Sequence, residues 1–562
     1  MLKRIFFSLL VLFYFPSQNL PASKKPEKGK NGMVVTASKL ATLVGTDILR
    51  KGGNAIDAAV AVGFTLAVTY PEAGNLGGGG FMVIRLSDGT ETTIDFREKA
   101  PSIANKNVYL DSAGNVVPGM TTEGWTSSGV PGSVAGLAFA LEKYGTMSLK
   151  EILQPAILLA EKGFPISESL AESLNWERKS FEKYPSTKKI FVKENEPWKA
   201  GDLLVQHDLA KTLKSIANEG VKVFYKGYIA DSIASQSKRS GWNISKEDLR
   251  NYSPVERKPV TGTYRGYKII SMPPPSSGGV ALIETLNALE NFNVDSLGWN
   301  SGAYVFTLTE ILKHVYADRS KHLGDPDFYP VKTKGLTDKK YALKIINSIA
   351  DTAIPSSQIA PAVFEPKESE ETTHYSVADS KGNAVSVTTT INSAYGNKIV
   401  VEGCGFLMNN EMDDFAAKPG VPNQFGLLGS EANSVQPGKR MLSSMTPTIV
   451  TKNDSLFMII GSPGGSTIIT TVLQCIVNVI DFKMNISEAI SAPRFHHQWL
   501  PDMIFRERFA LVKDVENYLL KKGENLGPVR RLGYAEGIIF NAKSKTFYGA
   551  SDPRGDGLAK GL

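Results

Sequence analysis

The chain has 562 residues, of which 42% are hydrophobic and 9% aromatic, and 63 Lys and Arg stand against 56 Asp and Glu. This composition is that of an ordinary globular protein with enough apolar residues for a large core, and it excludes a disordered, collagen-like or coiled-coil chain. Most of the net charge of +7 lies in the first thirty residues, where six Lys and Arg accompany one Glu. Because the remaining body is close to neutral, the excess charge does not predict a nucleic-acid partner.

The N-terminus is typical of a targeting segment. Lys3 and Arg4 precede an apolar run from Ile5 to Phe15 that is too short to span a bilayer, and small or polar residues follow up to about Ala22. We expect residues 1–22 to be a signal peptide, so that the mature protein is periplasmic or secreted and not inserted in a membrane. An uncleaved N-terminal anchor is the alternative interpretation.

The next 300 residues predict a mixture of helices and strands, after a basic linker that reaches about Lys30. The expected elements are a strand at Met33–Thr36, helices within 41–70 that break at Gly52-Gly53, a glycine-rich segment at 74–80, strands at Phe81–Arg85 and Thr92–Phe96, a helical layer over about 133–255, a strand at Tyr264–Met272, and helices near 280–292 and 302–322.

Residues 351–371 have the composition of a linker, with Pro355, Pro361 and Pro366 among Ser, Glu and Ala. At Thr372 the pattern changes abruptly to a β-hairpin, with strands expected at Thr373–Asp379 and Ala384–Asn392. A linker that ends at the first residue of a core strand makes sense if the chain is cut there.

A cut before Thr372 would give this residue a free α-amine beside its hydroxyl. An N-terminal Thr can use its own amine, with an ordinary pKa of about 7.7–8.0, as the base that activates the hydroxyl. The chain has no G-x-S-x-G motif that would supply a different nucleophile. Taken alone, a Thr at a strand start is more often structural, because Thr favours strands.

The hairpin brings Thr390 and Asn392 close to Thr372 on the neighbouring strand. A four-residue turn sets Thr373 opposite Thr390, whereas a one-residue bulge sets Thr372 there, and the sequence leaves both registers open.

A second candidate feature is the glycine-rich turn Gly461–Ser466 between an expected strand at Leu456–Ile460 and an apolar helix at Thr467–Ile480. Backbone N–H groups at such a junction favour an anion or a developing oxyanion. The turn lacks the Lys of a phosphate-binding loop, so a nucleotide site is not expected. A purely structural tight turn is the alternative.

Charged and hydroxyl residues near loops complete the candidates. An Arg with two hydroxyls suits a carboxylate, and paired acids suit an ammonium, so together they would bind the zwitterionic end of an amino acid. The residues are Arg97, Glu411, Asp413, Asp414, Ser443 and Ser444.

Neither cysteines nor histidines predict a metal site. Cys404 and Cys475 could pair in an exported chain, but each lies in a setting that equally favours a free buried thiol. The spacing of Cys and His fits no metal motif, and we expect no metal and no other cofactor.

Eight segments closely resemble the γ-glutamyltranspeptidase family of N-terminal-nucleophile hydrolases and follow its order over nearly the whole chain after the targeting segment. They are Lys51–Ala59, Gly74–Phe81, Asp95–Pro101, Thr372–Val377, Asn409–Phe415, Leu442–Met445, Gly461–Ser466 and Phe495–Pro501.

The resemblance implies an α+β fold, a four-layer αββα sandwich, in a precursor that cuts itself between Glu371 and Thr372. Residues 23–371 would form a large subunit that pairs with a small subunit of residues 372–562. Thr372 would attack the γ-glutamyl amide of glutathione or a related small molecule. Water or an acceptor amino acid or peptide would then release the acyl group.

The resemblance also implies roles for individual residues. Gly464 and Gly465 would form the oxyanion hole, and Thr390 would hydrogen-bond to the nucleophile. The α-carboxylate would be held by Arg97, Ser443 and Ser444, and the α-ammonium by Asn392, Glu411 and Asp414.

Four positions depart from the family pattern without removing a catalytic group. Phe425 stands in the lid loop where bacterial relatives commonly have Tyr, so the lid lacks a hydroxyl. The others are Thr389, Met441 and Thr467. Two alternatives stay open: an acylase of the same fold for glutaryl or cephalosporin-type groups, and an unprocessed binding protein that keeps the pocket without turnover.

Overall fold

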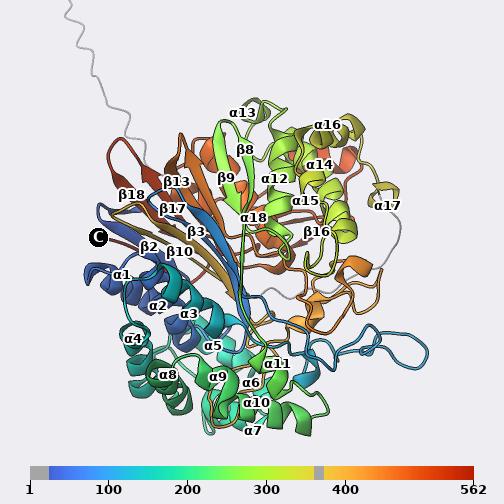
Figure 1. The fold of residues 1–562 in the computed structure, drawn as a ribbon. Coiled ribbons are helices and arrows are strands. Elements are labelled where there is room, and N and C mark those ends of the chain that lie inside the picture. Colours follow the sequence, from blue (N-terminus) through green and yellow to red (C-terminus); the bar gives the residue numbers. More distant parts are fainter. Residues whose placement is uncertain (1–23, 360–371) are drawn as a thin grey trace, which may run out of the picture.

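The computed structural model describes residues 24–359 and 372–562, and within them two seven-stranded antiparallel sheets stack face to face (Figure 1). The first sheet runs in the order β1 (Glu27–Gly29), β18 (Thr546–Ser551), β17 (Glu536–Asn541), β13 (Ser455–Gly461), β12 (Thr448–Lys452), β9 (Tyr267–Ser271) and β8 (Val260–Tyr264). The second runs β19 (Leu558–Gly561), β2 (Gly32–Thr36), β10 (Thr373–Asp379), β11 (Ala384–Thr390), β3 (Gly79–Arg85), β4 (Glu91–Asp95) and β7 (Val255–Arg257).

Helices cover the outer face of each sheet. Against the second sheet pack α1 (Lys39–Arg50), α2 (Ala55–Thr69) and α3 (Ser133–Tyr144), and beyond them lie α4 (Leu149–Lys162), α5 (Glu168–Trp176), α6 (Arg178–Phe181), α7 (Pro185–Phe191), α8 (His207–Glu219), α9 (Lys222–Lys226), α10 (Tyr228–Arg239) and α11 (Lys246–Arg250). Against the first sheet pack α12 (Gly278–Leu289), α18 (Ile468–Ile480) and α19 (Ile486–Ser491).

The helical layer on the first sheet is completed by α13 (Val294–Leu297), α14 (Gly302–His322), α15 (Thr333–Leu336), α16 (Lys339–Ser348), α17 (Ser356–Ile359) and α20 (Lys513–Lys521). Small strands lie outside the two main sheets: β5 (Phe164–Pro165) pairs with β6 (Leu203–Leu204), and β14 (Phe495–His496), β15 (Ile504–Arg506) and β16 (Leu526–Val529) form a third sheet. The expected four-layer αββα sandwich is therefore confirmed.

Buried, strongly apolar segments form the inner layers of this sandwich. Every residue of α2 is buried, and a capping box between Asn54 and Asp57 fixes its start directly after Gly52-Gly53. Every residue of β10 and β11 is buried as well, because these central strands have a sheet on one face and helices on the other. The nucleophile candidate thus begins one of the most enclosed strands of the protein.

Most expected elements up to residue 322 are present, and two of them differ in extent. The strand expected at Tyr264–Met272 is present as β9 but begins three residues later, because Arg265 and Gly266 have positive φ values of 51° and 80° and form the turn between β8 and β9. The linker expected up to Lys30 contains β1, which pairs with β18 and so is part of the first sheet.

The hairpin at the centre of the second sheet has Thr373 opposite Thr389, so the register with Thr373 opposite Thr390 was wrong. The bend lies at Asp379, whose N–H donates to the Asn383 carbonyl oxygen at 3.1 Å. In this register Thr372, directly before β10, lies at the level of Thr390, the last residue of β11. That arrangement is the alternative the sequence left open, and it needs no bulge.

Both main sheets contain strands from either side of residue 372. In the second sheet β10 lies between β2 and β11, while β11 pairs with β3. In the first sheet β12 pairs with β9, and β1 pairs with β18. A single cut before Thr372 would therefore separate no layer of the sandwich from another.

Candidate active site

One narrow cavity brings together ten of the residues singled out in the sequence. It is lined by Arg97, Thr372, Thr390, Asn392, Glu411, Asp414, Phe425, Ser443, Ser444 and Gly465, with Leu427, Met445 and Ile468. Gly464 precedes Gly465 in the turn at the cavity wall. Glu371 and the residues 1–22 lie outside the described part of the chain.

Thr372 is buried at the start of β10, beside the end of β11. The Thr390 hydroxyl oxygen accepts a hydrogen bond of 2.8 Å from the Asn392 N–H. Asn392 has a φ of 75°, and this left-handed conformation turns the chain sharply after β11. The turn holds Thr390 and Asn392 on the same wall of the cavity as Thr372.

The histidine nearest to Thr372 in sequence is not placed to act as its base. The imidazole of His374 is fully buried, packs where Gly461 leaves no room for a side chain, and contacts the hydroxyls of Thr388 at 2.9 Å and Ser376 at 3.1 Å. Burial lowers the pKa of His374 to about 3, so the ring is neutral at physiological pH. The absence of His374 from the cavity lining fits a nucleophile that uses its own α-amine.

The glycine-rich segment before β3 holds the end of the hairpin. Asn75 donates to the carbonyl oxygen of Thr390 at 2.9 Å and accepts from the Gly78 N–H at 3.0 Å. A Cβ atom on Gly78 would lie 2.1 Å from that same carbonyl oxygen. Glycine is required at this position because the two backbones approach too closely for a side chain. The sequence indicated the motif but not this role.

The turn after β13 contributes Gly465 to the lining of the cavity, and Gly464 precedes it. Gly464 and Gly465 have φ values of 130° and 51°, which glycine adopts readily, and among the described residues no acceptor receives a hydrogen bond from either amide. The Gly464 carbonyl oxygen, in contrast, accepts from the Thr467 hydroxyl at 2.7 Å. Two free N–H groups in a buried turn can stabilise an oxyanion.

Arg97 is the central charge of the cavity. It is fully buried at the end of β4, where its guanidinium pairs with Glu411 and Asp414, and Nε donates to the Met441 carbonyl oxygen at 3.3 Å. The sequence separates Arg97 from both acids by more than three hundred residues, and only the fold joins them.

Burial raises the pKa values of the acids around Arg97. It raises the pKa values of Glu411 and Asp414, while the positive charge of Arg97 opposes that rise. The neighbouring Glu98, whose Oε2 lies 3.8 Å from Arg97, has a pKa raised by burial to about 7. Arg97 and its three acids would carry a net charge of −2 if all were ionised, so protonation of one acid would reduce it to −1. Glu98 was not among the residues predicted to function, although it follows Arg97 directly.

A net of asparagine side chains positions the acidic end of the cavity. Asn409 donates to the carbonyl oxygens of Gly77 at 2.7 Å and Gly129 at 3.0 Å, and its own oxygen accepts from the Glu411 N–H at 3.1 Å. The Asn392 side-chain NH₂ donates to the Asn410 carbonyl oxygen at 3.0 Å. That contact directs the other end of the Asn392 amide, an acceptor, away from Asn410.

Ser443 and Ser444 line the cavity, and the hydroxyl oxygen of each already accepts one hydrogen bond from the protein. Ser443 Oγ accepts from the Met445 N–H at 3.1 Å, and Ser444 Oγ accepts from Arg319 at 3.1 Å. Arg319 belongs to α14, where helical periodicity gave no signal of a site. Asp413, part of the acidic group seen in the sequence, instead turns toward Thr121, whose hydroxyl donates to it at 2.6 Å.

Phe425 closes the cavity from the loop that follows Asp414. Its ring is buried against Gly465, and its carbonyl oxygen accepts from Gln498 at 3.0 Å. The Asn423 side chain, which also holds the Phe425 N–H, donates to Asp414 at 3.2 Å. The expected lid residue therefore covers the pocket without a hydroxyl group.

Among the described residues no cluster of three or more His, Cys, Asp or Glu could hold a metal ion. Cys404 and Cys475 are free and buried. Over the same residues, no helix has the length and apolar character needed to cross a bilayer. The cavity lining thus offers a cation and two hydroxyls to a carboxylate and two carboxylates to an ammonium, beside a threonine and a glycine-rich turn.

Comparison with known proteins gives the same picture. The family model described as gamma-glutamyltranspeptidase matches residues 41–562. A relative named glutathione hydrolase proenzyme, from Escherichia coli (strain K12), is 50% identical over 531 residues, which is 94% of this chain and 91% of the relative.

Two solved structures are similar to this fold. Cephalosporin acylase from Bacillus halodurans has a TM-score of 0.86 at 26% identity and covers 98% of this chain and 99% of its own. Gamma-glutamyltranspeptidase from Helicobacter pylori has a TM-score of 0.57 at 50% identity and covers 58% of this chain and 94% of its own.

Proposed function

The chain belongs to the gamma-glutamyltranspeptidase family, and from that premise we propose that it is a γ-glutamyl hydrolase and transpeptidase whose nucleophile is Thr372. Its substrates would be glutathione and related γ-glutamyl compounds. The observation that carries the proposal is the meeting, in one buried cavity beside Thr372, of groups that suit both charges of an amino acid.

Substrate binding would exchange partners inside this cavity. Arg97 is paired with Glu411 and Asp414. The α-carboxylate of a γ-glutamyl group would take the place of these acids at Arg97, with Ser443 and Ser444 donating to it. The α-ammonium would then meet the released acids, as well as the Asn392 amide oxygen. The buried charges remain balanced, because a zwitterion brings no net charge.

The reaction requires no group beyond those of the cavity and the new N-terminus. The α-amine of Thr372 takes the proton of its own hydroxyl as Oγ attacks the γ-carbonyl carbon, and Gly464 and Gly465 stabilise the oxyanion. The carbon–nitrogen bond breaks, the leaving amine receives the proton, and a γ-glutamyl ester remains on Thr372. Water or an acceptor amine then attacks the ester and restores the hydroxyl.

A cut between Glu371 and Thr372 would create this N-terminus and two subunits, 23–371 and 372–562. Because both sheets contain strands from each part, the subunits would stay together after the cut. We also propose that residues 1–22 direct export to the periplasm or beyond the cell, since they have the charge and apolar length of a signal peptide. N-terminal sequencing of the large subunit from the periplasmic or secreted fraction would test this; a start at Met1 would refute it.

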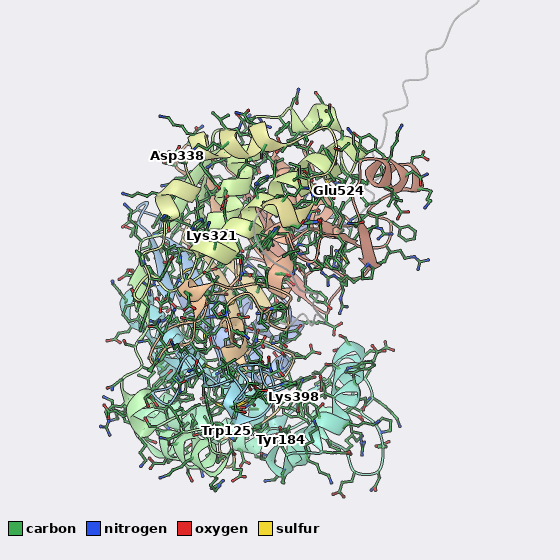
Figure 2. All side chains as sticks on the ribbon, turned by 90° about the vertical axis from the view of Figure 1, so that its right-hand side faces the viewer. Trp125, Tyr184, Lys321, Asp338, Lys398 and Glu524 are labelled. Carbon is green, nitrogen blue, oxygen red and sulfur yellow. The ribbon has the colours of Figure 1, made fainter. Side chains whose placement is uncertain are left out.

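A larger cleft, lined by chain neighbours of the cavity residues, is our proposed route for acceptors and leaving groups. Its walls include Ser393, Asn410 and Pro463, the chain neighbours of Asn392, Glu411 and Gly464. Lys398, labelled in Figure 2, lies on the same wall. This cleft would give a second substrate access to the acyl group on Thr372.

An acylase for glutaryl or cephalosporin-type groups is the alternative within this fold, favoured by the similarity to cephalosporin acylase. A glutaryl group has no ammonium, so Glu411 and Asp414 would then face no positive charge from the substrate. Comparison of γ-glutamyl-p-nitroanilide with glutaryl-p-nitroanilide tests the choice. Faster release of p-nitroaniline from the glutaryl compound would favour the acylase.

Replacement of the nucleophile tests the mechanism. We expect Thr372→Ala to remain a single chain without γ-glutamyl activity, whereas the native protein separates into two bands on a denaturing gel, the smaller beginning with Thr372. Thr373→Ala is the matched control, because the buried Thr373 hydroxyl has no hydrogen-bond partner among the described residues. Cleavage of Thr372→Ala at the same bond would show that Thr372 is not the nucleophile.

A further inference from the structure

Arg319 is a buried cation that the proposed chemistry has not yet used. It lies in the last turns of α14, only 5% exposed, and among the described residues no carboxylate lies within 4.0 Å of its guanidinium. Buried charges in proteins are normally paired, because an unpaired charge loses its hydration without compensation. A buried arginine beside a binding cavity therefore calls for an anion.

The contacts of Arg319 lead directly to the carboxylate end of the cavity. Its Nη2 donates to Ser444 Oγ at 3.1 Å, and its Nε donates to Ser277 Oγ at 3.0 Å. Ser277 in turn donates to the Ser443 carbonyl oxygen at 2.7 Å. The Arg319 guanidinium thus contacts the Ser444 side chain directly and the Ser443 backbone through Ser277.

The contact with Ser444 also determines where its hydroxyl proton points. A serine hydroxyl has one proton and two lone pairs, and the lone pair that faces Arg319 is occupied by an N–H donor. The proton must therefore point away from Arg319. Ser444 lines the cavity, and among the described residues no acceptor takes its proton, so the hydroxyl is set to donate into the cavity.

Arg319 also shares the site with a second buried arginine. Arg97 is the other cation whose charge acts on Arg319, and the acid Asp414 lies within electrostatic range of both. Arg97 is occupied by Glu411 and Asp414 until a substrate carboxylate displaces them. Arg319 has no such partner to displace, so its charge is available before the exchange begins.

We propose that Arg319 is a positioning residue for the γ-glutamyl donor, which fixes the Ser444 hydroxyl as a donor to the α-carboxylate and places a second positive charge behind it. The proposal rests on the proposed function, since it assigns a residue to the same substrate site. After the cut it would make one subunit orient a binding group of the other, because Arg319 belongs to the large subunit and Ser444 to the small one.

The test compares Arg319→Met with the native enzyme on two donors. One is γ-glutamyl-p-nitroanilide, and the other is 4-aminobutanoyl-p-nitroanilide, which keeps the ammonium and lacks the carboxylate. We expect Arg319→Met to raise KM for the γ-glutamyl donor about 10- to 100-fold, the effect of a lost charge-assisted hydrogen bond, with kcat changed less than about threefold. For the donor without a carboxylate, kcat/KM should change less than about threefold.

Two further variants separate positioning from a general structural role. Ser277→Ala removes the other hydroxyl that Arg319 contacts but leaves the contact with Ser444, so it should change the ratio of the two donors less than Arg319→Met does. In Arg319→Met with Ser444→Ala, KM should rise less than the product of the two single effects, because Arg319 acts through Ser444. Arg319→Lys, which keeps the charge, should recover part of the affinity.

The outcomes distinguish this proposal from the proposed function. Equal losses on both donors, or additive effects of Arg319→Met and Ser444→Ala, would refute the positioning role. If Arg319→Met does not mature on a denaturing gel, Arg319→Lys and Ser444→Ala carry the same comparison. Failure of the native enzyme to release p-nitroaniline from the γ-glutamyl donor would refute the proposed function instead.

Discussion

Replacement of Arg97 by Met would leave buried carboxylates facing one another without their cation. Arg97 is 0% exposed and pairs with Glu411, 1% exposed, and with Asp414, 13% exposed. Removal of one partner of a buried ion pair costs about 3–5 kcal/mol, because the remaining charge has neither water nor a counter-ion. A chain of this length has an unfolding entropy of about 1.1 kcal/mol per degree, so the melting temperature should fall by about 3–5 °C.

The loss of stability caused by Arg97→Met should be larger at high pH than at low pH. Without Arg97 the carboxyl groups of Glu98, Glu411 and Asp414 keep their burial and lose their counter-ion, so their pKa values in the folded state rise further above those of the unfolded state. Groups with raised folded pKa values contribute stability at low pH that is lost as pH rises through those values. We therefore expect Arg97→Met to cost less than half as much stability at pH 5.5 as at pH 8, a reduction of at least about 1.5–2.5 kcal/mol.

Thermal melting of the uncut Thr372→Ala chain at both pH values measures the effect without subunit dissociation. Adding Glu411→Gln and Asp414→Asn to Arg97→Met should restore most of the lost stability at pH 8, because neutral amides need no counter-ion. A loss that is equal at pH 5.5 and pH 8, or no recovery in the triple variant, would refute this account of the cavity.

Two other predictions concern the hairpin. Gly78→Ala places a Cβ atom 2.1 Å from the Thr390 carbonyl oxygen, which should lower the stability of the folded chain by about 1–3 kcal/mol. Self-cleavage, followed on a denaturing gel, should slow at least about tenfold. The control Gly335→Ala, which has open space around its Cβ position, should mature normally. Normal maturation of Gly78→Ala would contradict the close approach. The lowered pKa of His374, about 3, means that the folded chain stays neutral there while the unfolded chain binds a proton, so stability present above pH 6.5 is lost as the pH falls. In the uncut chain His374→Gln should remove about 1–2 kcal/mol of the stability lost between pH 6.5 and pH 5, measured by denaturant titration. An unchanged slope, or an equal change in the exposed control His207→Gln, would contradict the assignment.

The sequence predicted well those parts of the fold that depend on local pattern. The break at Gly52-Gly53, the strand that becomes β3, the hairpin after Thr372 and the turn at Gly461–Ser466 all follow from glycine placement and from apolar periodicity. The alternation of apolar and polar residues did not predict a turn at a residue that also suits a strand. Arg265 lies among strand-forming residues, yet it takes a positive φ and shortens the expected strand at its N-terminal end.

The candidate site was predicted mainly through its residue types and the family resemblance. Thr372 was indicated by an abrupt change from linker to strand, and Arg97 by its place after a strand. Arg319 could not have been found in this way, because one arginine near the end of a charged helix usually lies in solvent. Its burial depends on the packing of α14 against the segment that contains Ser443 and Ser444.

Residue types and their order were enough to indicate the proposed chemistry: a threonine that can become an N-terminus, two glycine amides, and charges that match an amino acid. Periodicity and turn residues are local properties, so they also determined most helices and strands. The tertiary structure alone decided the hairpin register that puts Thr372 beside Thr390, the pairing of Arg97 with acids from a distant loop, and the burial of Arg319. These depend on contacts between segments far apart in the chain, whose free energies are set by packing and desolvation and are not encoded in any local pattern.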